Sequence, residues 1–160
     1  MTVLIYLVAI TAANLIILQF GPVATIPVAF TLIGLDLVLR DKLHDAWRGN
    51  HLFLKMLALI VAGGGISYLI NSGAAQIALA SAIAFSGAMV VNALVYSMLI
   101  DRKWMIRSNG SNMPAAMVDS ILFPTIAFGM FMPHIVLGQF AAKVLGGLFW
   151  SWIVKRWTRT

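Results

Sequence analysis

An aspartate and a lysine, Asp119 and Lys143, each lie well inside a long apolar stretch of this sequence. Asp119 comes about six residues into its stretch, which corresponds to a depth of about 10 Å along a helix. An aspartate at the centre of a membrane helix costs about 2.5–3.5 kcal/mol to insert, so it should face a bundle interior and have a partner there. We therefore predict an ion pair between these two side chains.

This ion pair has two interpretations. It could serve only to fix one helix against another, because burial of such a pair is no proof of function. Ionisable residues at membrane depth, however, commonly mark a binding site or a pathway. Asn112 precedes Asp119 by two helical turns and Gln139 precedes Lys143 by one, so each helix face carries a further polar group. The pattern favours a site for a small, flat, polar ligand.

Small residues and a proline are predicted to make room beside these polar groups. Alanines at 115–116 and glycines at 146–147 lie about one turn from the acid and the lysine, and Trp150 follows the lysine by two turns. Pro124 has no amide hydrogen to donate to the carbonyl of Ser120, so the helix should bend there and leave that carbonyl available. A bend next to the acid would open a pocket.

Two further amides, Asn14 and Asn92, occupy other apolar stretches. Each could bridge two helices, a contact worth about 1 kcal/mol, or contribute to the polar site. Asn92 shares a helical stripe with Phe85, Met89 and Tyr96. An aromatic stripe with one amide suits either packing or a ring-shaped ligand.

The remaining titratable residues give weaker signals. Asp36 precedes Arg40 by one turn, an i,i+4 pair that could anchor its helix at the membrane interface. His44, His51 and His134 lie at the ends of apolar stretches and lack the spacing to carboxylates that a metal site needs. We predict no metal and no cofactor.

Sequence signatures of catalysis are missing. The chain has no HExxH motif and no GxSxG nucleophile turn, and the glycines at 63–65 lie in an apolar stretch without the following lysine of a phosphate-binding loop. The sequence therefore predicts a protein that is not an enzyme and does not itself hydrolyse ATP.

Composition places these residues in a membrane protein. Hydrophobic residues make up 61% of the 160 residues and charged residues only 10%, whereas soluble domains have about a quarter of charged residues. No cysteine is present, which excludes disulfides and thiolate metal sites. The net charge of +6 comes from basic residues directly beside apolar stretches, so we expect no nucleic-acid partner.

Six apolar stretches are long enough to cross a bilayer, which requires about 20 helical residues. The first has no basic residues before it and is kept as a span rather than a cleaved signal. The sequence therefore predicts an all-α fold, a bundle of six transmembrane helices that forms a single integral membrane domain over residues 1–160. The expected helices are 3–20, 22–39, 52–70, 74–100, 113–131 and 134–154.

The distribution of basic residues predicts the orientation. Positive charges favour the cytoplasmic side of a membrane. They concentrate after the second and fourth stretches and in the tail, so both termini are expected in the cytoplasm, at an inner membrane. These residues are Arg40, Lys42 and Arg48, then Arg102, Lys103 and Arg107, then Lys155, Arg156 and Arg159.

Two segments carry a family resemblance. SNMPAAMVDSILFPTIAFG and QFAAKVLGGLFWSWIV resemble the fifth and sixth helices of the VUT family, the queuosine-precursor transporters. The regions around Asn14 and Asp36 resemble the first two helices of that family less sharply. The bare six-helix unit is similar in architecture to the substrate-binding subunits of energy-coupling-factor transporters. The residues that carry the resemblance are Ser111, Asn112, Asp119, Phe123, Gln139 and Lys143.

The resemblance implies import of a 7-deazaguanine base, which is a cyano or aminomethyl precursor of queuosine or queuine itself. A guanine-like edge offers two parallel donors that a carboxylate can accept in bidentate fashion, and Asp119 is the candidate for this role. The other expected contacts are hydrogen bonds from Lys143, Gln139 or Asn112 and stacking on Phe123, Tyr96 or Trp150.

Two other functions stay open at the level of sequence. The chain could be a binding subunit that works only with a partner membrane protein and ATPases, since Ala9 and Ala13 provide a small-residue face for docking. It could also be a structural membrane protein in which Asp119 and Lys143 only hold two helices together. A monomer and a small homo-oligomer are both compatible with the sequence.

Overall fold

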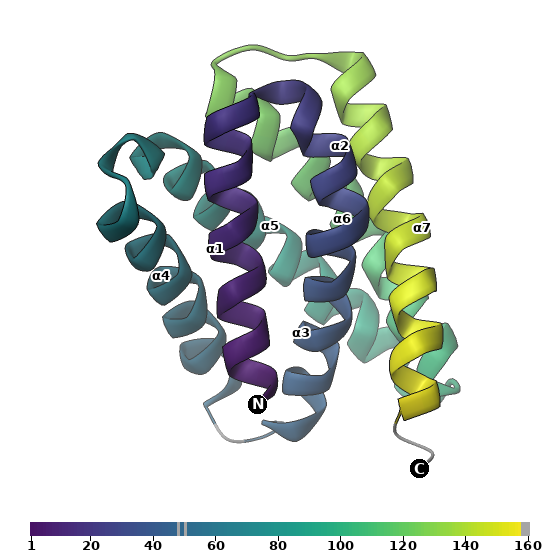
Figure 1. Ribbon diagram of the computed structural model, residues 1–160. Helices are drawn as coiled ribbons and strands as arrows, with labels where there is room; N and C mark the ends of the chain where they lie inside the picture. Colours follow the sequence, from purple (N-terminus) through teal and green to yellow (C-terminus); the bar gives the residue numbers. More distant parts are fainter. Residues whose placement is uncertain (48, 50, 158–160) are drawn as a thin grey trace.

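The computed structural model describes residues 1–47, 49 and 51–157 and consists of helices, with no strand in this part of the chain. Six helical rods pack into one bundle (Figure 1), which confirms the predicted all-α class. Arg48 and Arg159, two of the residues used to predict orientation, lie outside the described residues, as does the side chain of His44.

The rods follow one another up and down the bundle. Both termini lie at the same end in Figure 1, which we call the terminal end; the other is the opposite end. The first three rods are α1 (Thr2–Phe20), then η1 (Pro22–Ala24), α2 (Thr25–Val28), η2 (Ala29–Ile33) and α3 (Gly34–Ala46) as one rod, then α4 (Leu52–Ile70). The last three are η3 (Ser72–Ala74) with α5 (Ala75–Met98), α6 (Trp104–Phe128) and α7 (Pro133–Trp157).

Four of these rods are long and apolar enough to cross a membrane by length and composition, namely Thr2–Phe20, Pro22–Leu43, Ser72–Met98 and Pro133–Arg156. The third rod has a shorter apolar helix over Leu54–Ile70, and α6 does not meet this measure. The first half of α6 contains Ser108, Ser111 and Asn112, and all three are buried against other helices rather than exposed to lipid. The polar residues of α6 therefore contact other helices inside the bundle, which explains why this helix is less apolar than the others.

Several helix boundaries differ from the sequence prediction. The fifth rod begins at Trp104 rather than at 113, because the polar residues before Met113 hydrogen-bond within the bundle and do not end the helix. The fourth rod ends at Met98 rather than at 100, and the sixth extends to Trp157 rather than 154. The second rod continues to Ala46 rather than 39 and contains the π-helical segment η2, which the sequence did not indicate.

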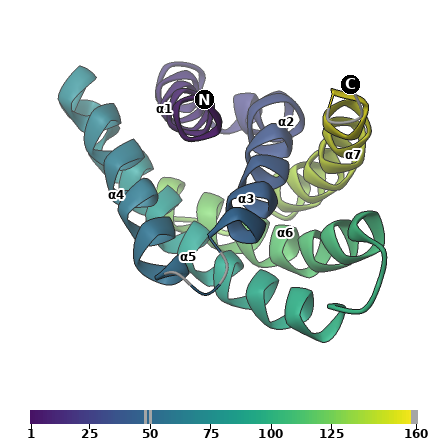
Figure 2. The ribbon, with the colours of Figure 1, turned by 90° about the horizontal axis from the view of Figure 1, so that it is seen from below.

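The rods form a closed ring. The main contacts run in the order α1, α4, α5, α6, α7 and the second rod, and α3 packs against α1 to close the ring. In addition, α1 touches α5 and α3 touches α6. Figure 2, seen from below, shows this arrangement, with α1 and α2 at the top, α5 at the bottom and α6 beside α7 at the right. Small residues contribute to these contacts, since Gly63 faces Ile10 and Ala80 and Ala84 are completely buried.

One close helix crossing corrects a prediction. A Cβ atom on Gly146 would collide with the backbone carbonyl of Phe30, and a Cβ on Gly34 would lie 2.8 Å from the carbonyl carbon of Gly146. The second rod and α7 therefore touch backbone to backbone. The space that glycine leaves at 146 is filled by the neighbouring rod and is not part of a ligand site. Nothing lies within 4 Å of a Cβ placed on Gly147.

Candidate functional site

The ion pair predicted from the sequence is present between α6 and α7. Lys143 Nζ lies 2.6 Å from Asp119 Oδ2, which confirms that prediction. The same Nζ donates to Ser120 Oγ at 3.1 Å and to Gln139 Oε1 at 3.0 Å. An ammonium group has three hydrogens, so each of them has an acceptor. These contacts fix Lys143 in place and satisfy its charge inside the bundle, where only 2% of its surface is exposed.

Asp119 faces a cavity enclosed by five of the six rods. The space open to the centre of a water molecule is about 30 Å³, which is enough for water and small beside ligand pockets of roughly 300–1,000 Å³. Besides Asp119 and Lys143, its polar lining consists of Asn14, Thr25, Ser81 and Gln139. Its apolar lining is Ile10, Ala13, Ile17, Val28, Ala29, Ile33, Phe85 and Phe123.

The hydrogen-bonding capacity around this cavity is partly unused. One oxygen of Asp119 binds Lys143, and the Asp119 side chain keeps 14% of its surface exposed. The Nε2 group of Gln139 is buried and has no partner among the described residues. A buried donor without a partner costs about 1–3 kcal/mol, so a ligand that supplies an acceptor would gain by binding there. The cavity thus combines an acceptor, a donor and the aromatic rings of Phe85 and Phe123.

Asn14 also lines the cavity, yet its amide is engaged by neighbouring helices. Its Nδ2 donates to Ser67 Oγ on α4 at 3.0 Å, and its Oδ1 accepts from Ser81 Oγ on α5 at 2.6 Å. These contacts correspond to the bridging role that the sequence left open. Asn14 therefore holds three helices together at the wall of the cavity.

Asn112 and Asn92 belong to a second polar cluster, nearer the terminal end. Asn112 Oδ1 accepts from Asn92 Nδ2 at 2.8 Å and from Arg40 Nη2 at 3.3 Å, and Asn112 Nδ2 donates to Asp41 Oδ2 at 2.8 Å. Ser108 Oγ donates to the same Asp41 oxygen. The structure thus places Asn112 and Asn92 with Asp41 rather than beside Asp119.

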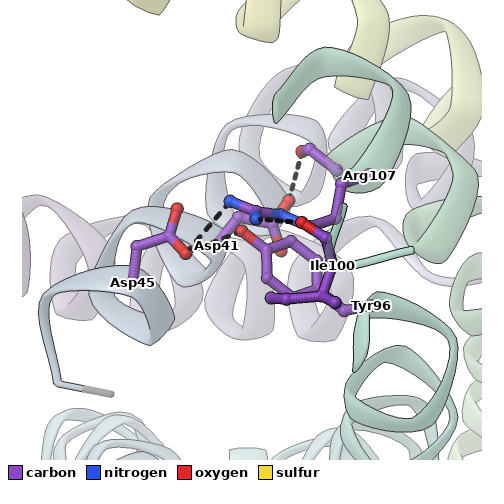
Figure 3. A network of polar contacts seen from close by, with 6 residues as sticks. Asp41, Asp45, Tyr96, Ile100 and Arg107 are labelled. Atoms are coloured by element: carbon purple, nitrogen blue, oxygen red, sulfur yellow. Dashed lines mark hydrogen bonds and ion pairs between the residues drawn. The ribbon is translucent and has the colours of Figure 1, made fainter. Parts of the chain in front are cut away.

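Tyr96 belongs to a third cluster at the terminal end itself. Tyr96 Oη donates to Asp45 Oδ1 at 2.8 Å, and the Arg107 guanidinium lies 4.5 Å from the centre of the Tyr96 ring. Figure 3 shows Arg107 between this ring and the carboxylate of Asp45, with a second hydrogen bond of 3.1 Å to the carbonyl oxygen of Ile100. The cluster joins α3, α5 and α6, and Tyr96 does not line the cavity.

Asp36 does not anchor its helix at the membrane interface. It is 0% exposed, and neither carboxyl oxygen has a hydrogen-bond partner among the described residues. Arg40 is 2% exposed and turns to Asn112 and to the ring of Phe85, whose centre is 5.2 Å from its Cζ atom. The i,i+4 contact expected from the sequence is not made, because α3 continues to Ala46 and thus carries both residues inside the bundle.

Trp150 lies outside the cavity lining as well. It is partly buried, and its ring meets that of Phe149 edge to face at 5.6 Å. Of the ten residues predicted for the site, the structure brings five to the cavity and distributes the other five elsewhere. The five at the cavity are Asp119, Lys143, Gln139, Asn14 and Phe123, and the others are Asn112, Asn92, Tyr96, Trp150 and Asp36.

Sequence reasoning missed several polar and aromatic residues of these sites. Phe85 was recognised only as part of a stripe that includes Asn92, and its place at the cavity depends on how α5 faces the other helices. Ser120 directly follows the acid, a signal that could have been used. Asp41 lies beyond the predicted end of its helix at Leu39, whereas in the structure the helix continues through it.

Comparison with known proteins adds one match. The model of a family described as putative vitamin uptake transporter matches residues 2–156. No curated protein and no solved structure matches the chain.

Proposed function

The chain belongs to the putative vitamin uptake transporter family, and we propose that it imports a 7-deazaguanine base, a queuosine precursor or queuine, across the inner membrane. The family membership makes it a membrane transporter rather than a structural protein. The observation that supports this substrate class is the Asp119 carboxylate, which is held by Lys143 and faces a cavity whose lining includes Phe85 and Phe123.

The chemistry of the cavity matches a guanine-like edge. Such a base carries a ring N–H beside an exocyclic amine and, next to these donors, a carbonyl oxygen. Asp119 accepts from the donors, and Gln139 Nε2, which has no partner among the described residues, donates to the carbonyl oxygen. Phe85 and Phe123 contribute ring surfaces for stacking. These three groups of the base thus meet complementary groups of the protein.

Lys143 keeps Asp119 ready for this role. In the absence of a ligand, its ammonium group balances the negative charge of Asp119 at 2.6 Å, which limits the cost of burying the acid. A neutral base that hydrogen-bonds to the free oxygen of Asp119 leaves this ion pair intact. The cavity is small, at about 30 Å³, so loading requires the surrounding helices to separate.

The experiment that tests this function is uptake in cells that neither make nor import queuosine precursors. Such cells, supplied with each base in turn, should form queuosine in their tRNA when they express the wild-type chain but not when they express Asp119→Asn. Asp101→Asn is the matched control, because Asp101 is an exposed acid in the connection before α6. Verified membrane insertion of all three proteins is required for the comparison.

Two outcomes would overturn the proposal. If the inserted wild-type protein does not restore queuosine with any of the supplied bases, this substrate class is excluded. If Asp119→Asn keeps full activity, the acid is excluded as the recognition group.

The small-residue face proposed for docking a partner subunit is not available in this structure. Ala9 and Ala13 are buried inside the bundle, with 4% and 1% of these residues exposed. This removes one argument for a function that depends on a partner subunit.

A further inference from the structure

Asp36 is a carboxyl group enclosed in the bundle without any hydrogen-bond partner among the described residues. An ionised carboxylate without hydrogen bonds or a counter-ion is very costly to bury, and such a group usually becomes neutral by taking up a proton. We propose that Asp36 binds and releases the proton that couples import to a proton gradient, an inference that rests on the proposed function.

The balance of charges in the interior supports this assignment. Three acids of the described residues lie within the bundle, Asp36, Asp41 and Asp119, beside two bases, Arg40 and Lys143. Lys143 forms an ion pair with Asp119 at 2.6 Å, and Asp41 accepts hydrogen bonds from two neighbouring side chains. One bound proton makes the set neutral, and Asp36 is the acid left without a partner.

Arg40 is a counter-ion poised for the ionised form of Asp36. It follows Asp36 by one helical turn, a spacing at which side chains on a helix can meet. In this structure its Nη2 instead donates to Asn112 Oδ1 at the long distance of 3.3 Å, while Nε and Nη1 are buried and have no hydrogen-bond partner in the described part of the chain. Two arrangements follow, one with protonated Asp36 and Arg40 on Asn112, the other with ionised Asp36 paired to Arg40.

Phe85 connects this switch to the substrate cavity. Phe85 lines the cavity, and the Arg40 guanidinium lies 5.2 Å from the centre of its ring. A base that stacks on Phe85 presses on the ring and thereby changes the position of Arg40. Occupation of the cavity and the charge of Asp36 are thus linked through one aromatic side chain.

The surroundings of Asp36 contain few other titratable groups. Tyr6 on α1, Arg40 and Asp41 on α3, and Asp119 on α6 interact with it electrostatically. On α7 the buried cation is Lys143, which is bound to Asp119, whereas Lys155 and Arg156 lie in the last turn of that helix. The segment η2 has no titratable residue. The π-helical segment η2 ends at Ile33, shortly before Asp36, and π segments often occur at functional sites, where they give a helix room to change register.

The proton step is balanced without a further reactant. Outside, a proton binds a carboxylate oxygen of Asp36 and the base enters the cavity. Inside, the O–H bond breaks, the proton passes to water at the terminal end, and the carboxylate left behind pairs with Arg40. One proton therefore enters with each base, and the gradient supplies the driving force.

Transport by the purified chain in liposomes tests the coupling. With an interior more alkaline by about one pH unit, wild-type protein should accumulate labelled base up to about tenfold, and a protonophore should abolish this accumulation. At equal pH, exchange of labelled for unlabelled base needs no net proton movement. Asp36→Asn, which resembles the protonated acid, should keep exchanging base but lose accumulation, and Asp101→Asn should keep both.

Infrared spectroscopy of the protein without substrate tests the proton site separately. Wild-type protein at neutral pH should show a protonated carboxyl band that Asp36→Asn lacks and Asp101→Asn retains. Absence of this band overturns the inference. Exchange of base by the wild-type protein without any effect of the pH gradient also overturns it, but that result leaves the proposed function intact. If the wild-type protein exchanges no base, the proposed function and the proposed proton coupling are both wrong. The infrared band then tests only whether Asp36 holds a proton.

Discussion

The guanidinium of Arg107 lies 4.5 Å from the centre of the Tyr96 ring, and both side chains also contact the carboxylate of Asp45 (Figure 3). These three residues come from α6, α5 and α3 and lie nearer the terminal end than the cavity does. We infer that this cluster closes the cavity from the terminal end, since it ties together three of the rods that would have to separate for release.

Weakening this cluster should make the cavity more accessible from the terminal end. Asp45→Asn reduces its hydrogen bond to Tyr96 and its ion pair with Arg107, a loss of about 1 kcal/mol that corresponds to about a fivefold larger open population. The chain has no cysteine, so Ile33→Cys at the cavity wall can report access to a membrane-impermeant thiol reagent. Equal labelling rates with and without Asp45→Asn would contradict the closing role, and Asp101→Asn serves as control.

A double substitution separates the charge balance of the central pair from its role in recognition. Asp119→Asn alone leaves the Lys143 cation buried without its counter-ion and should destabilise the protein by about 3–5 kcal/mol. Adding Lys143→Gln removes the unbalanced charge, so the thermal unfolding temperature in detergent should recover. Uptake should remain lost, because the acceptor for the base is missing. Recovery of uptake together with stability would assign the pair a purely structural role.

The ion pair between Asp119 and Lys143 could be predicted from sequence because burying either charge without a partner costs much free energy. An acid inside an apolar helix needs a partner, and Lys143 was the base at comparable depth, so composition nearly determined the contact found at 2.6 Å. The amides carry no such penalty. Asn112 can satisfy its hydrogen bonds in several ways, and its choice of Asp41 and Asn92 depends on how three helices are rotated.

The packing around η2 could not be predicted for a related reason. Glycine at 146 signals only that a backbone can come close, and it does not say whether a ligand or another helix fills the space. The structure shows Phe30 of the second rod there. Asp36 and Arg40 have the spacing of a helical ion pair, yet contacts with Asn112 and Phe85 take Arg40 elsewhere, which i,i+4 spacing alone cannot reveal.

Both termini are expected on the cytoplasmic side of the membrane. The described basic residues at the terminal end, among them Arg102, Lys103 and Arg156, favour that side. A reporter that fluoresces only in the cytoplasm should therefore be bright on either terminus, whereas alkaline phosphatase, which is active only outside, should be inactive there. Fused at Ser72, the first residue of η3 at the opposite end of the bundle, the phosphatase should be active. A bright signal from one terminus only would contradict the even number of crossings.

The contact between the second rod and α7 predicts a large difference between two adjacent glycines. In Gly146→Ala the new methyl group would overlap the backbone carbonyl of Phe30, and backbone cannot yield as a flexible side chain does. Overpacking of this kind costs about 1–3 kcal/mol, so the unfolding temperature should fall. Gly147→Ala is the matched control, since no other helix comes within 4 Å of its new methyl group and alanine is the better helix former. Equal stability of the two variants would mean that the rods are farther apart in the membrane. Because η2 and cavity residue Ala29 lie next to Phe30, Gly146→Ala should also impair uptake more than Gly147→Ala.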